Sequence, residues 1–226
     1  LSKGLTLTGW YAHARNIGVT YGLTDPRYPD KSALYNDLPN TATISPIYQL
    51  PLGKGQAFLN HGGLLDQVVG GWQLGGIFTA RSGFPFTPTL SGTNLLNNAE
   101  LNEDVPNRIC NGTISNPTPA NWFDKSCFTM PVEPTTPGAQ LVEGNSSVNI
   151  LRGPRAFTFD ANLSKTFSLT ERYKLDFRFE IFNLLNHPNL GQPDASILPN
   201  GNNIPATITT TVTLPRILQF AMKFHF

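Results

Sequence analysis

The residues that could perform chemistry are few, and their spacing matches no catalytic or metal-binding pattern. No His-Glu-x-x-His zinc motif and no Gly-x-Ser-x-Gly nucleophile elbow occurs in the 226 residues. Gly53-Lys54-Gly55 lacks the further glycine spacing and the Lys-Ser/Thr pair of a phosphate-binding loop, so it indicates a turn. The histidines are scattered over different segments: His13, His61, His187 and His225. The sequence therefore predicts no catalytic residues, no metal site and no cofactor, and we expect that the protein is not an enzyme.

The two cysteines, Cys110 and Cys127, lie in one Asn/Pro-rich segment with sixteen residues between them. Such a pair within a single loop predicts a disulfide formed in an oxidising compartment, worth about 3 kcal/mol if loop entropy dominates. Two unpaired thiols are the alternative. A metal site is disfavoured because no histidine lies nearby and two ligands are too few.

Charged side chains alternate with apolar ones from Lys174 to Ile181. This two-residue period predicts a strand with one apolar and one charged face. A soluble sandwich would place the charged face in water, whereas a wide membrane barrel would place it in a polar lumen. Asp176, Arg178 and Glu180 are therefore candidate polar residues of a lumen, with no specific indication of a role in substrate passage.

The same alternation marks the end of the chain, where Leu218, Phe220, Met222, Phe224 and Phe226 share one face. Four further segments show it less strictly, one of them irregular because it contains two prolines. A short helical turn is predicted between the second and third strands, over 64–69. The six predicted strands cover Gly4–Arg15, Ile44–Leu52, Gly71–Arg81, Phe157–Ser164, Lys174–Ile181 and Arg216–Phe226.

The connections between these strands alternate in length. Long segments rich in Asn, Pro, Gly and Thr follow the first, third and fifth strands, over 16–41, 82–154 and 186–214. Shorter links follow the second and fourth, over 53–70 and 168–173. Long loops outside and short turns in the periplasm are typical of outer-membrane barrels, and six strands then return the C-terminus to the periplasm. Whether the long loop 83–154 is ordered stays open.

Composition narrows the class further. Only 14% of the residues are charged and the net charge is +1, so no electrostatic footprint for nucleic acid exists. No apolar run approaches the about 20 residues that a membrane-spanning helix needs. Several aromatic residues near predicted strand ends suggest an interfacial belt, although ordinary strand aromatics are an equal alternative. They are Trp10, Tyr11, Tyr48, Trp72, Phe84, Phe86 and Tyr173. Because Leu1 is not Met and no export signal follows, we expect the chain to begin inside something larger or after processing.

Several passages together resemble the C-terminal barrel of Oar-like TonB-dependent receptors, which carry a carboxypeptidase-regulatory-like domain at their N-terminus. The passages occur in the family's order across nearly the whole chain, and each one is weak by itself. In one-letter form they are QLPLGKG (49–55), VGGWQLGGI (69–77), SGFPFT (82–87), NWFD (121–124), NILRGP (149–154), FEIFNLLNHP (179–188) and the closing aromatic strand.

The resemblance implies that Phe220, Met222, Phe224 and Phe226 form the signal that the outer-membrane assembly machinery reads. The same side chains would also face the outer-membrane lipid. The resemblance further implies partners outside these residues: the remainder of the receptor barrel, its plug, and TonB through an N-terminal part. Transporters of this architecture have about 22 strands and the smallest bacterial barrels about 8, so six strands cannot close alone.

We therefore predict an all-β fold, with residues 1–226 as one C-terminal segment of antiparallel up-and-down strands from a transmembrane outer-membrane β-barrel, a partial barrel with long extracellular loops. The expected function is uptake of a bulky nutrient across the bacterial outer membrane. A second hypothesis is a structural or adhesive surface protein whose strands pair between copies. A third, a soluble all-β binding module or hydrolase, lacks any catalytic constellation.

Overall fold

The computed structural model describes residues 4–19, 31–60, 63–91, 103–131, 144–198 and 205–226. Within these ranges six long strands form one sheet in the order β1-β4-β5-β14-β15-β17, and every neighbouring pair is antiparallel. The strands are β1 (Leu5–His13), β4 (Asn40–Gln49), β5 (Gln73–Arg81), β14 (Ala156–Ser168), β15 (Lys174–Phe182) and β17 (Ile217–His225). All six lie where the alternating pattern predicts strands, and the sheet stays open, with β1 and β17 at its edges.

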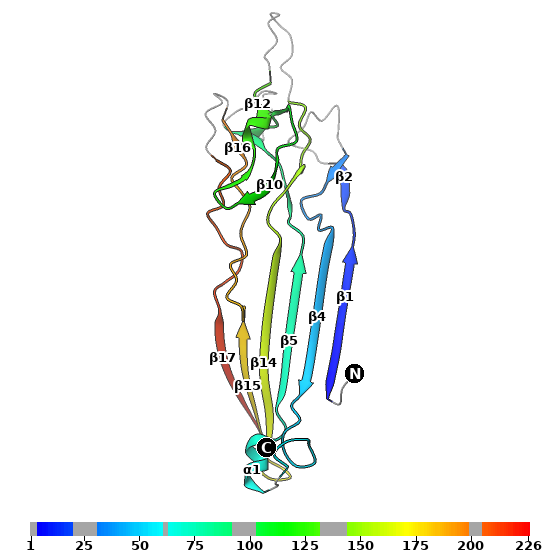
Figure 1. Ribbon diagram of the computed structural model, residues 1–226, viewed down its shortest axis with the longest axis vertical. Helices are drawn as coiled ribbons and strands as arrows, with labels where there is room; N and C mark the ends of the chain where they lie inside the picture. Colours follow the sequence, from blue (N-terminus) through cyan, green and yellow to red (C-terminus); the bar gives the residue numbers. More distant parts are fainter. Residues whose placement is uncertain (1–3, 20–30, 61–62, 92–102, 132–143, 199–204) are drawn as a thin grey trace, which may run out of the picture.

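The connections divide between the two ends of the sheet (Figure 1). The helix α1 (Leu64–Val69), as predicted, lies at one end, together with the turn between β14 and β15. The chain ends lie toward that same end, as an even number of strands requires. The short elements of the long connections gather at the opposite end. Among the described residues, no helix is long and apolar enough to cross a membrane.

Cross-strand register gives the sheet one apolar face and one polar face. Residues paired across antiparallel strands point to the same side, so each row of partners can be assigned to a face. The apolar face carries Leu5, Leu7, Tyr11, Ile44, Tyr48, Leu74, Phe78, Phe157, Phe159, Leu163, Leu175, Phe177, Phe179, Leu218, Phe220, Met222 and Phe224. The polar face carries Thr6, Thr8, Thr43, Ser45, Gln49, Gln73, Thr79, Asn162, Ser164, Thr166, Asp176, Arg178, Glu180, Gln219 and Lys223.

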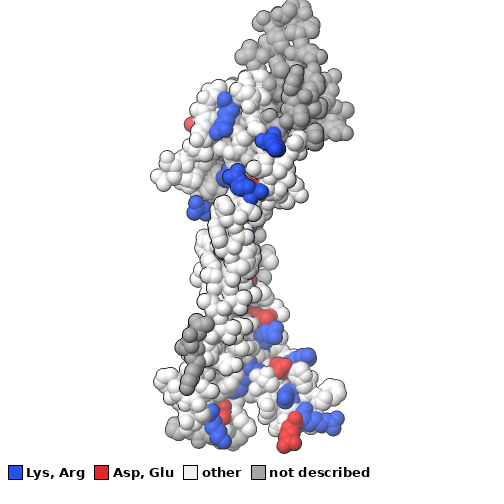
Figure 2. Space-filling model, turned by 90° about the vertical axis from the view of Figure 1, so that its right-hand side faces the viewer, with Lys and Arg blue, Asp and Glu red and all other residues white. Residues whose placement is uncertain are grey.

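The apolar face is not covered by the chain itself. Phe220 and Met222 remain 67% and 71% exposed, although Phe179 stacks on Phe220 with ring centroids 4.6 Å apart. In the edge-on view of Figure 2, charged side chains gather toward the two ends, and a nearly uncharged band lies between them. A soluble sandwich would bury such a face in its own core, so the arrangement favours contact with hydrocarbon.

The hydrophobic core lies instead in the long connections. The segment 83–154 contains short strands wherever it is described, and it packs with the connection that follows β15. The core residues are Phe86, Leu90, Phe123, Cys127, Phe128, Leu151, Ile197 and Ala206. We call this unit the cap.

The cap and the connection after β1 are built from short elements. They are β2 (Ile17–Val19), β3 (Lys31–Ala33), β6 (Pro85–Phe86), β7 (Thr89–Ser91), β8 (Glu103–Asp104), β9 (Asn107–Arg108), β10 (Thr113–Thr118), β11 (Asn121–Phe123), η1 (Lys125–Cys127), β12 (Phe128–Thr129), β13 (Leu151–Arg152) and β16 (Ser196–Ile197).

Two aromatic positions differ from the predicted belt. Trp10 pairs with Thr43 and therefore lies on the polar face, because it is one residue out of phase with Tyr11. Phe86 is 8% exposed and packs against Phe123 inside the cap, with ring centroids 5.4 Å apart. Both corrections have one cause. A position near a strand end in the sequence determines neither the face of the sheet on which an aromatic side chain lies nor the residues against which it packs.

The irregular strand predicted around Pro46 is confirmed. On the β1 side Pro46 pairs with Leu7, but the ladder between β4 and β5 is interrupted at Ser45 and Pro46. Proline has no N–H to donate, so the gap falls where a ladder hydrogen bond would be missing. The register is the same on both sides of the gap, which keeps the two faces continuous.

Candidate functional site

The polar face brings the predicted charged residues together on β15, where they pair with their neighbours. Asp176 accepts a hydrogen bond from Thr166 Oγ1 on β14 at 2.7 Å, and its other oxygen lies 2.7 Å from His225 Nε2 on β17. Arg178 Nη1 lies 3.5 Å from Glu180 Oε1 on the same strand. Opposite charges in adjacent rows keep the face polar with little net charge.

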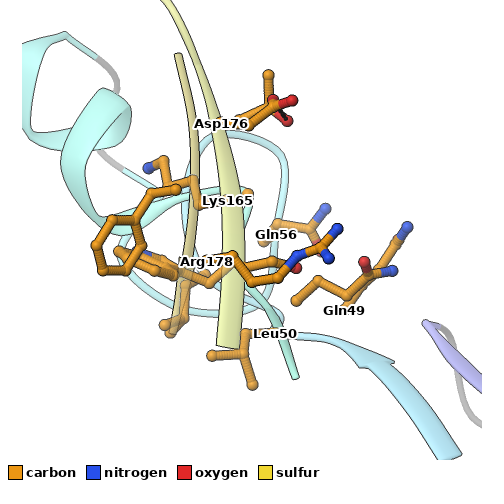
Figure 3. Close-up of a pocket in the computed structure, with 13 residues that line it drawn as sticks. Gln49, Leu50, Gln56, Lys165, Asp176 and Arg178 are labelled. Carbon is orange, nitrogen blue, oxygen red and sulfur yellow. Dashed lines mark hydrogen bonds between the residues drawn. The ribbon is translucent and has the colours of Figure 1, made fainter. Parts of the chain in front are cut away.

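A cleft of about 490 Å³ opens at the α1 end of this polar face. Its polar lining comes from four strands and from the link after β4: Gln49, Gln56, Gln73, Ser164, Thr166, Asp176 and Arg178. In Figure 3 Gln49, Gln56 and Arg178 extend to one side, whereas Lys165 extends away from them toward α1. Amides, a guanidinium and a carboxylate can hydrogen-bond a polar ligand or chain segment. They do not form a nucleophile–base pair, and polar groups of this kind are typical of surfaces that hydrogen-bond a ligand.

The side chain of Lys165 breaks the pattern of the apolar face and was not predicted. It is 6% exposed, and its ammonium donates to the carbonyl oxygens of Gln67 and Val68 at the end of α1. The ammonium also lies 5.5 Å from the ring centroid of Trp72 and 4.7 Å from that of Phe167. A charge on an apolar face requires such partners. The sequence did contain a signal for this position, because Lys165 is in phase with the apolar residues Leu163 and Phe167 on either side of it.

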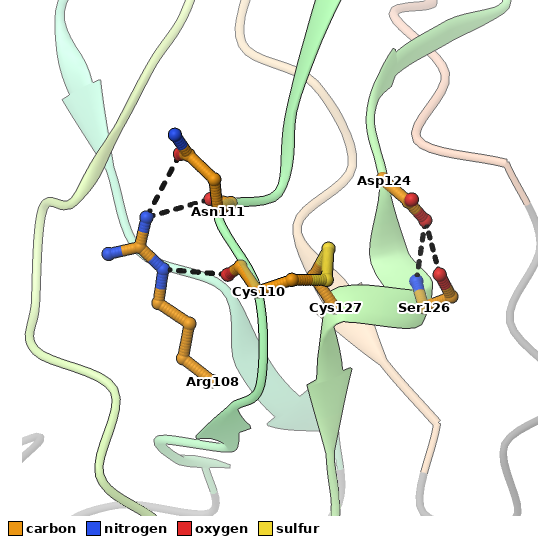
Figure 4. Close-up of a disulfide and its surroundings, with 6 residues drawn as sticks. All are labelled: Arg108, Cys110, Asn111, Asp124, Ser126 and Cys127. Carbon is orange, nitrogen blue, oxygen red and sulfur yellow. Dashed lines mark hydrogen bonds between the residues drawn. A yellow bond between two sulfur atoms is a disulfide. The ribbon is translucent and has the colours of Figure 1, made fainter.

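The predicted disulfide is present and closes part of the cap (Figure 4). Cys110 and Cys127 are joined by a bond of 2.04 Å. Beside it, Arg108 donates from Nε to Cys110 O at 3.0 Å and from Nη2 to Asn111 O at 2.8 Å. Asp124 accepts from the backbone and hydroxyl of Ser126, which begins the turn that carries Cys127.

A buried lysine joins the long connection that follows β5 to the one that follows β15. The Lys125 side chain is 4% exposed, and its Nζ lies 2.8 Å from both Asp194 Oδ2 and Ser196 O. Burial raises the pKa of Asp194, but hydrogen bonds from Lys125 and Ser196 outweigh it and hold that pKa below its usual value. The two connections therefore form one unit.

A buried carboxylate attaches the first long connection to the same cap. Asp37 is fully buried, accepts the backbone N–H of Asn16 at 2.6 Å and pairs with Arg152, which also donates to Asp37 O at 2.7 Å. Burial raises the pKa of Asp37, but the hydrogen bonds from Asn16 and Arg152 hold it below its usual value. Sequence reasoning missed Asp37, Lys125 and Asp194, because their partners lie far away along the chain.

The apolar residues predicted as an assembly signal lie on the free edge strand or at the chain end. Phe220, Met222 and Phe224 project from the apolar face of β17, and Phe226 is 85% exposed just beyond it. The backbone edge of β17 opposite β15 has no partner strand among the described residues. This edge could accept another strand, which is compatible with the predicted role.

Chemistry-bearing residues are not brought together elsewhere in the described ranges, where no three His, Cys, Asp or Glu side chains could jointly hold a metal ion. His187 stacks on Phe157 with ring centroids 4.1 Å apart, His13 contacts Asn40 and His225 contacts Asp176. His61 lies outside the described residues.

Comparison with known families agrees with this geometry. A family model described as "Outer membrane beta barrel domain" matches residues 1–219, nearly the whole chain. No curated protein and no solved structure matches the chain. The match covers the first five strands of the two-faced sheet, the start of β17 and the cap between them, and it places the protein in the bacterial outer membrane. The chain belongs to the outer membrane beta barrel domain family.

Proposed function

We propose that this chain forms part of the barrel of an Oar-like TonB-dependent receptor that imports a bulky nutrient across the outer membrane. The observation that carries the proposal is the two-faced sheet of six strands, with its long connections gathered at one end into a cap. The cap would face the exterior, and α1 with the C-terminus would face the periplasm. Loops of this length on the outer side are typical of outer-membrane barrels.

The free edges support a barrel larger than these strands. β1 and β17 run in opposite directions and each spans nine residues. In a closed antiparallel barrel they would pair with further strands of the same receptor, because about eight strands is the smallest closed size. Because β1 and β17 run in opposite directions, an even number of further antiparallel strands can be placed between them.

The polar face and the cap support transport over catalysis. The cap is held together by a disulfide and the Lys125–Asp194 ion pair, and the Asp37–Arg152 pair joins the first long connection to it. These links would give the cap a defined surface for capturing a ligand. Below it, the polar face would line the lumen around a plug, with Asp176, Arg178 and Glu180 among the lining residues. Energy would arrive through TonB at the N-terminal part of the receptor, and no bond of the ligand would be broken at this segment.

Uptake measured with and without energy coupling tests this proposal. Cells that express the whole coding sequence are given fluorescent oligosaccharides, oligopeptides and chelated metal ions, and uptake is compared between a TonB-competent and a TonB-deficient background. Uptake of one class that requires both the protein and TonB supports the proposal. A receptor from which the cap segment 103–131 is deleted should insert yet lose the uptake. Equal uptake without the protein or without TonB contradicts the proposal.

A second candidate function is self-association of a surface protein, and the same free edges favour it. The β17 edge of one copy could pair antiparallel with the β1 edge of another. Light scattering of the protein in detergent separates the candidates, because a receptor is monomeric. Cysteines introduced at Thr8 on β1 and Ala221 on β17 should cross-link between copies only if the second candidate is correct.

A further inference from the structure

A groove of about 460 Å³ lies on the apolar face at the cap end of the sheet, away from the polar cleft. It is lined by residues of β1, β4, β5 and β14 that lie in neighbouring rows of the register. The lining includes Tyr11, Asn40, Ala42, Phe78, Ala80, Ser82, Arg155 and Phe157. The groove therefore opens toward the side of the sheet that the proposed barrel turns to lipid.

The shape of the groove follows from one row of side chains. Tyr11 pairs with Ala42, Ala42 with Ala80, and Ala80 with Phe157, so two small residues lie between two aromatic ones. Adjacent strands are about 4.8 Å apart, and this spacing makes the alanine floor two strands wide. Phe78, in the next row toward α1, also lines the groove. A floor of methyl groups between aromatic walls fits an acyl chain.

The next row toward the cap is polar on the same face. Tyr11 donates its hydroxyl to Asn40 Oδ1 at 2.6 Å, and His13 Nδ1 lies 2.9 Å from the same oxygen. Asn40 Nδ2 in turn donates to Ser82 Oγ at 3.2 Å. Arg155 directly precedes β14 beside Ser82, is exposed, and forms no ion pair with an acidic side chain of the described residues. An exposed guanidinium thus borders an apolar trough.

We propose that this groove binds a phosphorylated, acylated lipid of the outer leaflet, with an acyl chain over Ala42 and Ala80 and a phosphate at Arg155. This inference rests on the proposed function, because it requires the apolar face in lipid and the cap outside. Guanidinium and phosphate form bidentate, charge-assisted hydrogen bonds. In the neighbouring row, the Ser82 hydroxyl and the Asn40 amide can donate to the headgroup. The boundary between the two rows matches the boundary between headgroups and hydrocarbon.

The chemistry favours a lipid over a soluble anion. A free phosphate would meet one exposed arginine, and such a contact is weak in water. An acyl chain adds the burial of apolar surface on the alanine floor, which a soluble anion cannot supply. Binding should therefore need both halves of the groove.

Native mass spectrometry of the full receptor, purified in detergent, tests the proposal. The probe is bisphosphorylated lipid A, compared with its fully dephosphorylated form and with inorganic phosphate as competitor. Arg155→Gln should weaken lipid A retention about tenfold, the usual scale for one charge-assisted contact. Ala42→Leu with Ala80→Leu should weaken it similarly by filling the floor. Arg216→Gln is the matched control, since Arg216 precedes β17 at the same end of the sheet and lies outside the groove.

The outcomes are separable. Loss with Arg155→Gln and with the leucine pair, but not with Arg216→Gln, supports the groove. An equal loss with Arg216→Gln, competition by inorganic phosphate, or undiminished binding of the dephosphorylated form overturns it. Brominated phospholipids provide the independent check, because Trp72 on the apolar face should be quenched in wild type and the signal lost in Trp72→Phe. Quenching without Arg155-dependent binding overturns only the groove, whereas no quenching overturns the proposed function with it.

Discussion

The Cys110–Cys127 disulfide in the cap leads to a measurable prediction, because its two cysteines differ in burial. Cys127 is 4% exposed in the cap core, whereas Cys110 is exposed, so Cys110→Ala removes the bond with little loss of packing. The two cysteines are 17 positions apart in sequence. A closed loop of that size restricts the unfolded chain by about 3 kcal/mol in the loop-entropy model. Opening of the cap should therefore become roughly a hundredfold more frequent.

Amide hydrogen exchange measures this opening locally. The Ile109 N–H donates to Cys127 O at 2.9 Å beside the disulfide, so its protection reports on the cap. Amides of the β14–β15 ladder serve as the internal control, since the long strands share no residue with the closed loop. Protection should fall in the cap and stay unchanged in the ladder. Unchanged protection at Ile109 would refute the reasoning, and equal loss in both regions would show that the cap does not unfold separately.

Four further predictions concern the charged and apolar groups. Asp37→Asn should free the first long connection at a cost of about 3–5 kcal/mol, because Arg152 then loses its buried partner; protease cleavage of that connection measures it. The folded pKa of Asp37 lies below the unfolded value, so its contribution to stability is complete above about pH 4 and is lost as the pH falls through the folded pKa. Cleavage of the first long connection should therefore rise across an acid series. Cleavage that does not rise contradicts this. Phe220→Arg should lower stability in vesicles by up to about 2–4 kcal/mol, and its neighbour Gln219→Arg on the polar face by much less; equal urea midpoints would contradict the assignment of faces. Lys165→Met should expose α1 to proteolysis at a cost of about 1–3 kcal/mol, and unchanged cleavage there would show that the ammonium does not hold the helix.

Burial and exposure have reversed roles in this protein, and that reversal links fold to function. Large apolar side chains of the long strands, such as Phe220 and Phe224, are exposed, whereas the long connections contain the buried core. A membrane supplies the apolar partner for the strands, but the cap lies in water and must bury its own aromatics. Under the proposed function, the cap can therefore be shaped for a ligand while the strands keep a common pattern.

The six long strands were determined by the sequence itself. Alternation with period two needs only neighbouring residues, so β15 and β17 and the split of Asp176, Arg178 and Glu180 from Phe177 and Phe179 were predictable. The helix over 64–69 and the closeness of the two cysteines in one segment were local signals as well.

The cap was decided only by tertiary structure. Asp37 meets Arg152 across 115 positions, and Lys125 meets Asp194 across 69. The alanine floor of the lipid groove likewise arises from the register of four strands. No periodicity along the chain encodes such meetings, because each depends on how separate segments are stacked in space. Local pattern specifies which residues alternate, and packing alone specifies which of them touch.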